Sequence, residues 1–266
     1  MASTTRAQGS AERWGPLWGA RPADWALSED LQGPTYEAAF ERVGLEPGWR
    51  VLDVGCGAGS FLRLVADRGG EPHGLDASEA LIAFSRERLP GADLRVGEME
   101  ALPWEDDTFD LVTGFNAFFF ANDMVAALRE AGRVAKPGAR VVIQVWGDHE
   151  NCDLEAMKLA ARPFFPPRPA DAPADPDFSQ PGILPALATE AGLVPEQEFT
   201  ATWTSEYPDA ETLGRAMIAV AGLVVLAGPA REEELRTAIV DGLAPFRTPD
   251  GGYRFSNEYR YLVASA

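Results

Sequence analysis

Three glycines alternate directly after a short apolar stretch that predicts a buried strand. The segment reads VLDVGCGAGSF over residues 51–61, with Gly55, Gly57 and Gly59 separated by single residues. Glycine lets the backbone turn sharply and lets a ligand lie against bare amides at the start of a helix, although purely structural turns use it too. A dinucleotide site would need its third glycine at the sixth position, where this chain has Ser60. The spacing therefore indicates a different kind of ligand loop.

Two acidic residues accompany these glycines. Asp53 lies two residues before Gly55, and Asp76 follows a second apolar stretch at residues 73–75. A carboxylate at Asp76 can accept protons from two ribose hydroxyls in charge-assisted hydrogen bonds. We expect Asp53 to orient the loop or to hold an ammonium group, and a residue that only pins the turn is the alternative. Ser78 is expected to cap the next helix.

The elements that must position these residues alternate between strand and helix. Such alternation is typical of a parallel sheet covered on both faces, and we expect an α/β, doubly wound, mostly parallel seven-stranded Rossmann-like sheet. Asn122 can cap the helix at 123–135, and Lys136-Pro137-Gly138 can end it. Strands are expected at residues 51–54, 73–75, 94–96, 110–113 and 139–145, and helices at 61–67, 80–89 and 123–135.

We expect much of the second half of the chain to cover this sheet. Residues 161–185 are rich in proline and predict an irregular segment. Helices between the last two strands cannot lie in the sheet, so we expect them to form a helical lid with the first forty residues. Helices are expected at 183–191, 209–228 and 231–243, strands at 198–204 and 254–264, and an organisation into a helical cover (1–40), a core (41–147) and a lid (148–266) within one domain.

Four ordered motifs across residues 45–147 resemble the class I S-adenosylmethionine-dependent methyltransferases. They read VLDVGCGAGSF, HGLDAS, GEMEALPWEDDTFDLV and REAGRVAKPGARVVI. The resemblance implies S-adenosyl-L-methionine as cofactor and S-adenosylhomocysteine as product. It implies that Asp76 holds the ribose and that Glu98, where the family usually has Asp, faces the adenine amino group beside Met99. The implied cofactor-binding residues are Asp53, Gly55, Cys56, Gly57, Gly59, Asp76, Ala77, Glu98, Met99, Phe115 and Asn116.

An aromatic cluster follows the fourth predicted strand, at the edge where an open α/β sheet binds its ligand. It comprises residues 115–120, FNAFFF. Asn116 lacks the Pro-Pro that follows it in nucleic-acid amino methyltransferases, which argues against base methylation. The rings could wall a substrate pocket or favour the sulfonium cation, and core packing beneath the lid is the equal alternative. Trp14, Trp18 and Trp25 could cover the cofactor or dock on the sheet.

A general base is hard to find in this sequence. The chain has two histidines, of which His73 reads as structural and His149 follows the fifth predicted strand on the ligand side. We take His149 as the catalytic candidate, with a solvated loop histidine as the alternative. Tyr36, Tyr207 and Glu206 are weaker candidates. Positioning alone can lower the barrier by up to about 7–11 kcal/mol, so no base need be conspicuous.

Composition limits the partners. The 266 residues carry 23 Lys and Arg against 41 Asp and Glu, a net charge of −18, which repels polyphosphates and anionic membranes. Two cysteines form no disulfide framework, the polar start lacks a secretory core, and we see no apolar run of the roughly 18 residues that a membrane span needs. We expect a cytoplasmic protein without nucleic-acid, membrane or metal partners; oligomeric state stays open.

The sequence thus predicts a methyltransferase that acts on a small molecule, with oxygen, carbon and nitrogen all open as the methylated atom. The part after Gly147 resembles methyltransferases of bacterial quinone and natural-product metabolism. A nicotinamide oxidoreductase is disfavoured by Ser60. The remaining alternative is a protein of the same fold that keeps the cofactor as a structural ligand or catalyses a rearrangement without methyl transfer.

Overall fold

A twisted sheet of seven strands organises the part of the chain that the computed structural model describes, residues 9–167 and 176–266. Its order is β3-β2-β1-β4-β5-β7-β6, parallel from β3 to β5, with β7 antiparallel to both of its neighbours. This confirms the predicted doubly wound, mostly parallel fold. The strands are β1 (Arg50–Val54), β2 (Glu71–Asp76), β3 (Asp93–Val96), β4 (Phe109–Phe115), β5 (Ala135–Trp146), β6 (Val194–Tyr207) and β7 (Tyr253–Ser265).

Helices cover both faces of the sheet because neighbouring residues of each buried strand point to opposite faces. Val51 packs with α3, α4 and α5, whereas Leu52 and Val54 pack with α6 and α8 on the other face. The helices are α1 (Ser10–Trp18), α2 (Pro22–Glu29), α3 (Gly33–Val43), α4 (Ser60–Asp67), α5 (Glu79–Arg88), α6 (Met124–Val134), α7 (Glu155–Ala161), α8 (Ile183–Glu190), α9 (Ala210–Ala219), α10 (Leu223–Ala227) and α11 (Glu232–Gly242).

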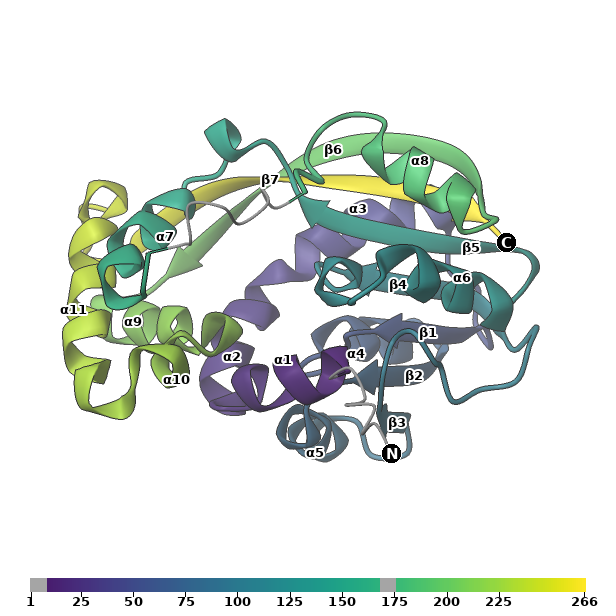
Figure 1. The fold of residues 1–266 in the computed structure, drawn as a ribbon, viewed down its shortest axis with the longest axis horizontal. Coiled ribbons are helices and arrows are strands. Elements are labelled where there is room, and N and C mark those ends of the chain that lie inside the picture. The colour runs from purple at the N-terminus through teal and green to yellow at the C-terminus, as the bar shows by residue number, and fades with distance from the viewer. Residues whose placement is uncertain (1–8, 168–175) are drawn as a thin grey trace, which may run out of the picture.

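A separate group of helices forms the lid that the sequence predicts. Helices α7, α9, α10 and α11 share their own apolar core and gather around one end of the long strands β6 and β7, at the left of Figure 1. The N-terminal helices α1 and α2 lie between this lid and the β1–β3 side of the sheet (Figure 1). Residues 1–8 of the predicted leader, and 168–175 of the predicted irregular segment, lie outside the described residues.

The expectation of one helix over residues 209–228 is wrong, because the backbone breaks within it. Ala221 has φ 47° and Gly222 φ 68°, and the short turn η5 (Val220–Gly222) separates α9 from α10. By length and composition alone, the stretch Ala210–Ala227 could cross a membrane, with mean hydropathy 1.7. Here it contributes to the lid core.

Helix α6 begins one residue later than expected. Asp123, not Asn122, is its N-cap, since an Asp123 side-chain oxygen accepts from the Ala126 amide at 3.0 Å. The Asn122 amide instead donates to Glu100 at 2.7 Å. A carboxylate at this position complements the partial positive charge of the helix start, which an amide side chain does less well.

Candidate functional site

The glycine loop joins β1 to α4 and turns back on itself. Gly55, Gly57 and Gly59 all have positive φ, of 79°, 53° and 83°. The Gly55 amide donates to the Leu75 carbonyl at 2.7 Å, which ties the loop to the end of β2. A Cβ on Gly55 would lie 2.5 Å from the Ala117 Cβ, and one on Gly57 would collide with the Glu29 carboxylate. Both glycines are therefore required by conformation and by space.

Asp76 ends β2 with its carboxylate turned toward this loop. Its two oxygens accept from the Gly57 amide at 3.0 Å and from the Ser78 amide at 2.8 Å. Burial raises the pKa of Asp76, and these backbone hydrogen bonds oppose that rise. Ser78 caps α5 as predicted, accepting from the Leu81 amide at 3.1 Å. Each Asp76 oxygen keeps acceptor capacity for a further donor.

Asp53 is buried at the base of the same loop. It is 3% exposed, and the Thr113 hydroxyl of β4 donates to it at 2.7 Å. Burial raises the pKa of Asp53 well above the usual range, and the nearby Glu29 and Asp76 carboxylates raise it further. The Thr113 hydrogen bond fixes the Asp53 side chain, and its expected role in orienting the loop or holding an ammonium group stays a prediction.

Glu29 brings a third carboxylate into the loop, and the sequence analysis did not identify it. Its oxygens accept from the Ala58 amide at 2.6 Å and the Ser60 amide at 2.9 Å, and from the Trp25 indole at 2.6 Å. Burial raises the pKa of Glu29 despite these donors. Glu29 ends α2, so the N-terminal cover is attached directly to the start of α4. The tryptophan-rich leader was the one signal that pointed to this region.

A cavity of about 360 Å³ opens beside these carboxylates and extends to the lid. Its walls include Trp14, Trp18 and Trp25, so the leader tryptophans do cover the site. Nine of the predicted cofactor residues line it, namely Asp53, Gly55, Cys56, Gly57, Asp76, Ala77, Met99, Phe115 and Asn116.

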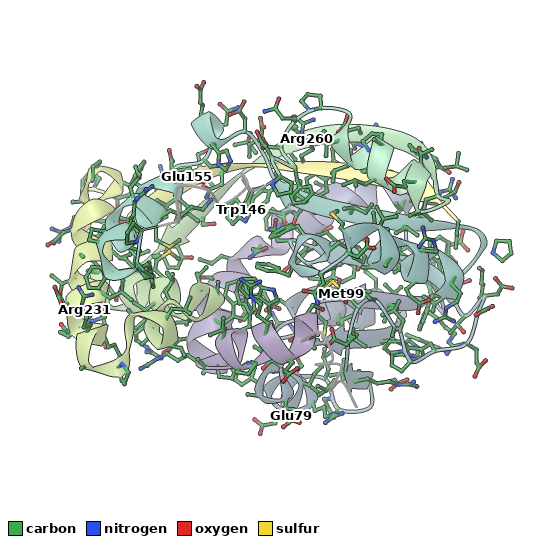
Figure 2. All side chains as sticks on the ribbon, viewed as in Figure 1. Glu79, Met99, Trp146, Glu155, Arg231 and Arg260 are labelled. Carbon is green, nitrogen blue, oxygen red and sulfur yellow. The ribbon has the colours of Figure 1, made fainter. Side chains whose placement is uncertain are left out.

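Gly59 and Glu98, the other two predicted cofactor residues, are not part of the cavity lining. Gly59 is the N-cap of α4 and provides the turn alone. Glu98 faces helix α1, where one of its oxygens accepts from the Ser10 hydroxyl at 2.6 Å and the Ala11 amide at 2.9 Å. The arrangement corrects the expectation of a Glu98 that is free to meet adenine. Met99, by contrast, lines the cavity from the sheet side (Figure 2).

Asn116 supplies an unsatisfied acceptor to the cavity. It follows β4 with φ 51°, and its buried side-chain oxygen has no hydrogen-bond partner among the described residues. A buried acceptor without a donor is costly, so this oxygen favours a ligand that carries N–H or O–H groups.

The lid end of the cavity is mainly apolar and aromatic. Trp146 ends β5 there, and Glu155 reaches it from α7 (Figure 2). Lys158, the one cationic side chain among the described lining residues, pairs with Glu155 at 2.5 Å. The other lid-side walls are Cys152, Leu154, Met157, Ser205, Tyr207, Met217, Val220, Ala221 and Tyr259.

His149 lies outside the cavity lining. Its side chain is 58% exposed, and its Nδ1 atom is 3.0 Å from a Glu155 carboxylate oxygen. This geometry corrects the expectation that His149 faces the ligand. Of the weaker candidates, Tyr36 and Tyr207 line the cavity, whereas Glu206 forms an exposed ion pair with Arg254. No cluster of three metal-binding side chains occurs in the described part of the chain.

The family profile described as a methyltransferase domain matches residues 52–143. The demethylmenaquinone methyltransferase of Renibacterium salmoninarum is 30% identical over 62% of this chain and 68% of its own length. The malonyl-[acyl-carrier protein] O-methyltransferase of Methylococcus capsulatus is 34% identical over 57% of each chain. The chain belongs to the S-adenosylmethionine-dependent methyltransferases, and S-adenosyl-L-methionine is its cofactor.

Solved structures share the fold at low sequence identity. Haemonchus contortus phosphoethanolamine N-methyltransferase 2, in complex with S-adenosyl-L-methionine, superposes with a TM-score of 0.58 at 14% identity, covering 100% of this chain and 61% of the other. The [4+2]-cyclase SpnF gives 0.57 at 21% identity, covering 87% and 79%. At these identities the likeness supports the architecture alone.

The residues of the cavity fit this cofactor. Glu29, Asp53 and Asp76 offer three buried carboxylates with no ion pair among the described residues, which suits a ligand bearing an ammonium and a sulfonium. Asn116 offers an acceptor for a donor group. When bound, the cofactor supplies an electrophilic methyl group. The chain's own part is to bind, orient and exclude water around the acceptor.

Proposed function

We propose that this chain methylates a small, largely apolar molecule held between the glycine loop and the lid. The supporting observation is that a single cavity joins the loop carboxylates to the aromatic and aliphatic lid wall. A methyl donor at the loop and an acceptor under the lid would then share one water-poor space. The names of the two relatives favour quinone-type or acyl-type acceptors.

In this proposal different residues of the site bind different parts of the cofactor. Asp76 accepts from the ribose hydroxyls, since each of its oxygens keeps free lone pairs. Asp53 and Glu29 face the positively charged methionine end, and Ala77 and Met99 border the adenine. The net charge of −18 supports an enzyme without nucleic-acid or anionic-membrane partners, and we propose that it acts in the cytoplasm.

Calorimetric titration with S-adenosyl-L-methionine tests the cofactor half. Asp76→Ala should weaken binding at least about tenfold, because it removes charge-assisted hydrogen bonds. Asp67→Ala is the control, since Asp67 is exposed at the end of α4. Equal affinity of the Asp76→Ala variant and the unaltered protein would refute this placement of Asp76.

A rearrangement without methyl transfer is the second candidate, because a [4+2]-cyclase shares this fold. The two functions differ in product. A methyltransferase forms S-adenosylhomocysteine in step with the consumed acceptor, whereas a rearrangement leaves the cofactor intact. Quantifying S-adenosylhomocysteine over a panel of phenolic, acyl and amine acceptors separates them.

A further inference from the structure

All five tyrosines of the chain are buried, and their hydroxyls divide into two kinds. The Tyr207 hydroxyl lies 3.1 Å from the Ser28 hydroxyl, and the Tyr261 hydroxyl donates to the Thr35 carbonyl at 3.0 Å. The hydroxyls of Tyr36, Tyr253 and Tyr259 have no hydrogen-bond partner within residues 9–167 and 176–266, and of these three residues Tyr36 and Tyr259 line the cavity. Neither of these two hydroxyl oxygens is among the fully buried unpartnered atoms of the described residues, so both are open to a ligand in the cavity.

Tyr36 and Tyr259 both line the cavity and belong to the same apolar cluster. The Tyr36 ring, from α3, meets the Phe115 ring edge-on at a centroid distance of 4.7 Å. The Tyr259 ring, from β7, stacks on Trp146 at 5.0 Å. Phe115 belongs to the cofactor side and Trp146 borders the lid side, so the pair stands where the two ends of the cavity meet.

The chemistry of the two side chains limits what they can do. Burial raises the pKa of Tyr36 and of Tyr259 well above the usual range, and nearby Glu29 and Asp53 raise that of Tyr36 further. Neither phenol therefore serves as a base at neutral pH. Each is a neutral donor held by ring packing, so its hydroxyl is best satisfied by an oxygen with free lone pairs.

The rest of the surroundings favours a flat, apolar frame around that oxygen. The walls near the pair are aromatic or aliphatic, among them Trp146, Met157 and Met217. The one cation of the described lining, Lys158, is neutralised by Glu155. A strongly anionic or highly polar acceptor would find little compensation there.

We propose that Tyr36 and Tyr259 are a donor pair that binds an oxygen of the acceptor, and that the acceptor is a hydroxylated aromatic molecule or its enol equivalent. This rests on the proposed methyltransferase function and names its substrate class. Neither tyrosine exchanges a proton with the acceptor. They fix its oxygen at the junction of the two cavity ends.

Three probes of one shape test the pair on the unaltered protein. They are 4-nitrophenol, 4-nitroaniline and 4-nitrotoluene, titrated in the presence of S-adenosylhomocysteine so that no turnover occurs. We expect 4-nitrophenol to bind at least about tenfold more tightly than the other two, because its hydroxyl oxygen can accept from the two tyrosines. Equal binding of 4-nitrophenol and 4-nitrotoluene, or tighter binding of 4-nitroaniline, would overturn the proposal.

Hydroxyl deletion tests the two residues. Tyr36→Phe and Tyr259→Phe should each lose about tenfold in 4-nitrophenol affinity and leave 4-nitrotoluene binding unchanged. Tyr261→Phe is the matched control, because its hydroxyl is used within the core by Thr35 and Gln144. Unchanged 4-nitrophenol affinity in both test variants contradicts the proposal, as does a loss of S-adenosylhomocysteine affinity in Tyr36→Phe, which would make that residue part of the cofactor site.

The measurements also separate this inference from the function on which it rests. Failure of S-adenosyl-L-methionine to bind the folded, unaltered protein would refute the methyltransferase function itself. Normal cofactor binding with no preference for 4-nitrophenol would refute the donor pair alone.

Discussion

Glu29 shows how much of the site depends on one residue far from the motif that it completes. It lies 29 positions before Ala58 and 31 before Ser60, the two residues whose amides it accepts. Its carboxylate also accepts from the Trp25 indole. Nothing in the spacing of the sequence predicts such a contact, because residues 9–43 carry no ligand motif of their own. The glycines and Asp76 could be predicted because their spacing within a strand, a turn and a helix start is itself the signal.

Replacing Glu29 by Gln should destabilise the fold. One amide oxygen cannot accept from all three donors, so a buried N–H loses its partner, and the free energy of unfolding should fall by about 1–3 kcal/mol. Urea denaturation measures this. Glu37→Gln is the control: its ion pair with Arg68 is 43% exposed on the Glu37 side and should contribute less than about 1 kcal/mol. Equal effects of the two substitutions would show that Glu29 is dispensable to the loop.

At the scale of elements, the sequence predicted the core well and the cover less well. The strands and helices between residues 50 and 146 occur where apolar runs and helical periods place them, because covered parallel strands are continuously apolar. The break at Ala221 could not be predicted, since alanine favours helix and only the packing of α9, η5 and α10 imposes its φ of 47°. The contacts among the lid helices could not be predicted either, because they too depend on tertiary packing.

Gly57→Ala tests whether α2 and the glycine loop fit together as one unit. The added Cβ would meet both a positive φ and the Glu29 carboxylate, so α2 should be displaced and S-adenosyl-L-methionine affinity should fall at least about tenfold. Gly182→Ala at the start of α8 is the control, with φ 84° and open space around its Cβ. Calorimetry should show normal cofactor binding for Gly182→Ala; a normal value for Gly57→Ala would contradict the packing of Glu29 against the loop.

The whole molecule carries a net charge of −18, and three of its carboxylates are buried together in the cavity. These three, Glu29, Asp53 and Asp76, have raised pKa values because burial penalises their charge. Asp93 behaves oppositely, since its hydrogen bonds to Arg95 lower its pKa to about 2. Burial therefore disfavours the charged form of the three cavity carboxylates, whereas hydrogen bonds to Arg95 favour the charged form of Asp93.

The sign of the pH dependence follows from these shifts. Between the unfolded carboxyl pKa, about 4, and the raised folded value, the folded state holds more protons than the unfolded state. The stability contributed by Glu29, Asp53 and Asp76 is therefore present below that window and falls as pH rises through it. Asp93 contributes stability that is present above its unfolded pKa, about 4, and is lost as pH falls from there through its folded pKa of about 2.

A cation that binds beside the three carboxylates lowers their pKa values, because it favours the charged forms that burial disfavours. S-adenosyl-L-methionine should therefore bind more tightly as pH rises from about 4 and should release protons as it binds. Calorimetry in two buffers of different ionisation enthalpy counts those protons. S-adenosylhomocysteine lacks the sulfonium charge, so its binding should release fewer protons. Binding of S-adenosyl-L-methionine to the Asp53→Asn variant should also release fewer protons than binding to the unaltered protein. Proton release that is equal for the two nucleosides would show that the carboxylates do not sense the sulfonium, and the buried charge of this cavity would then need another partner.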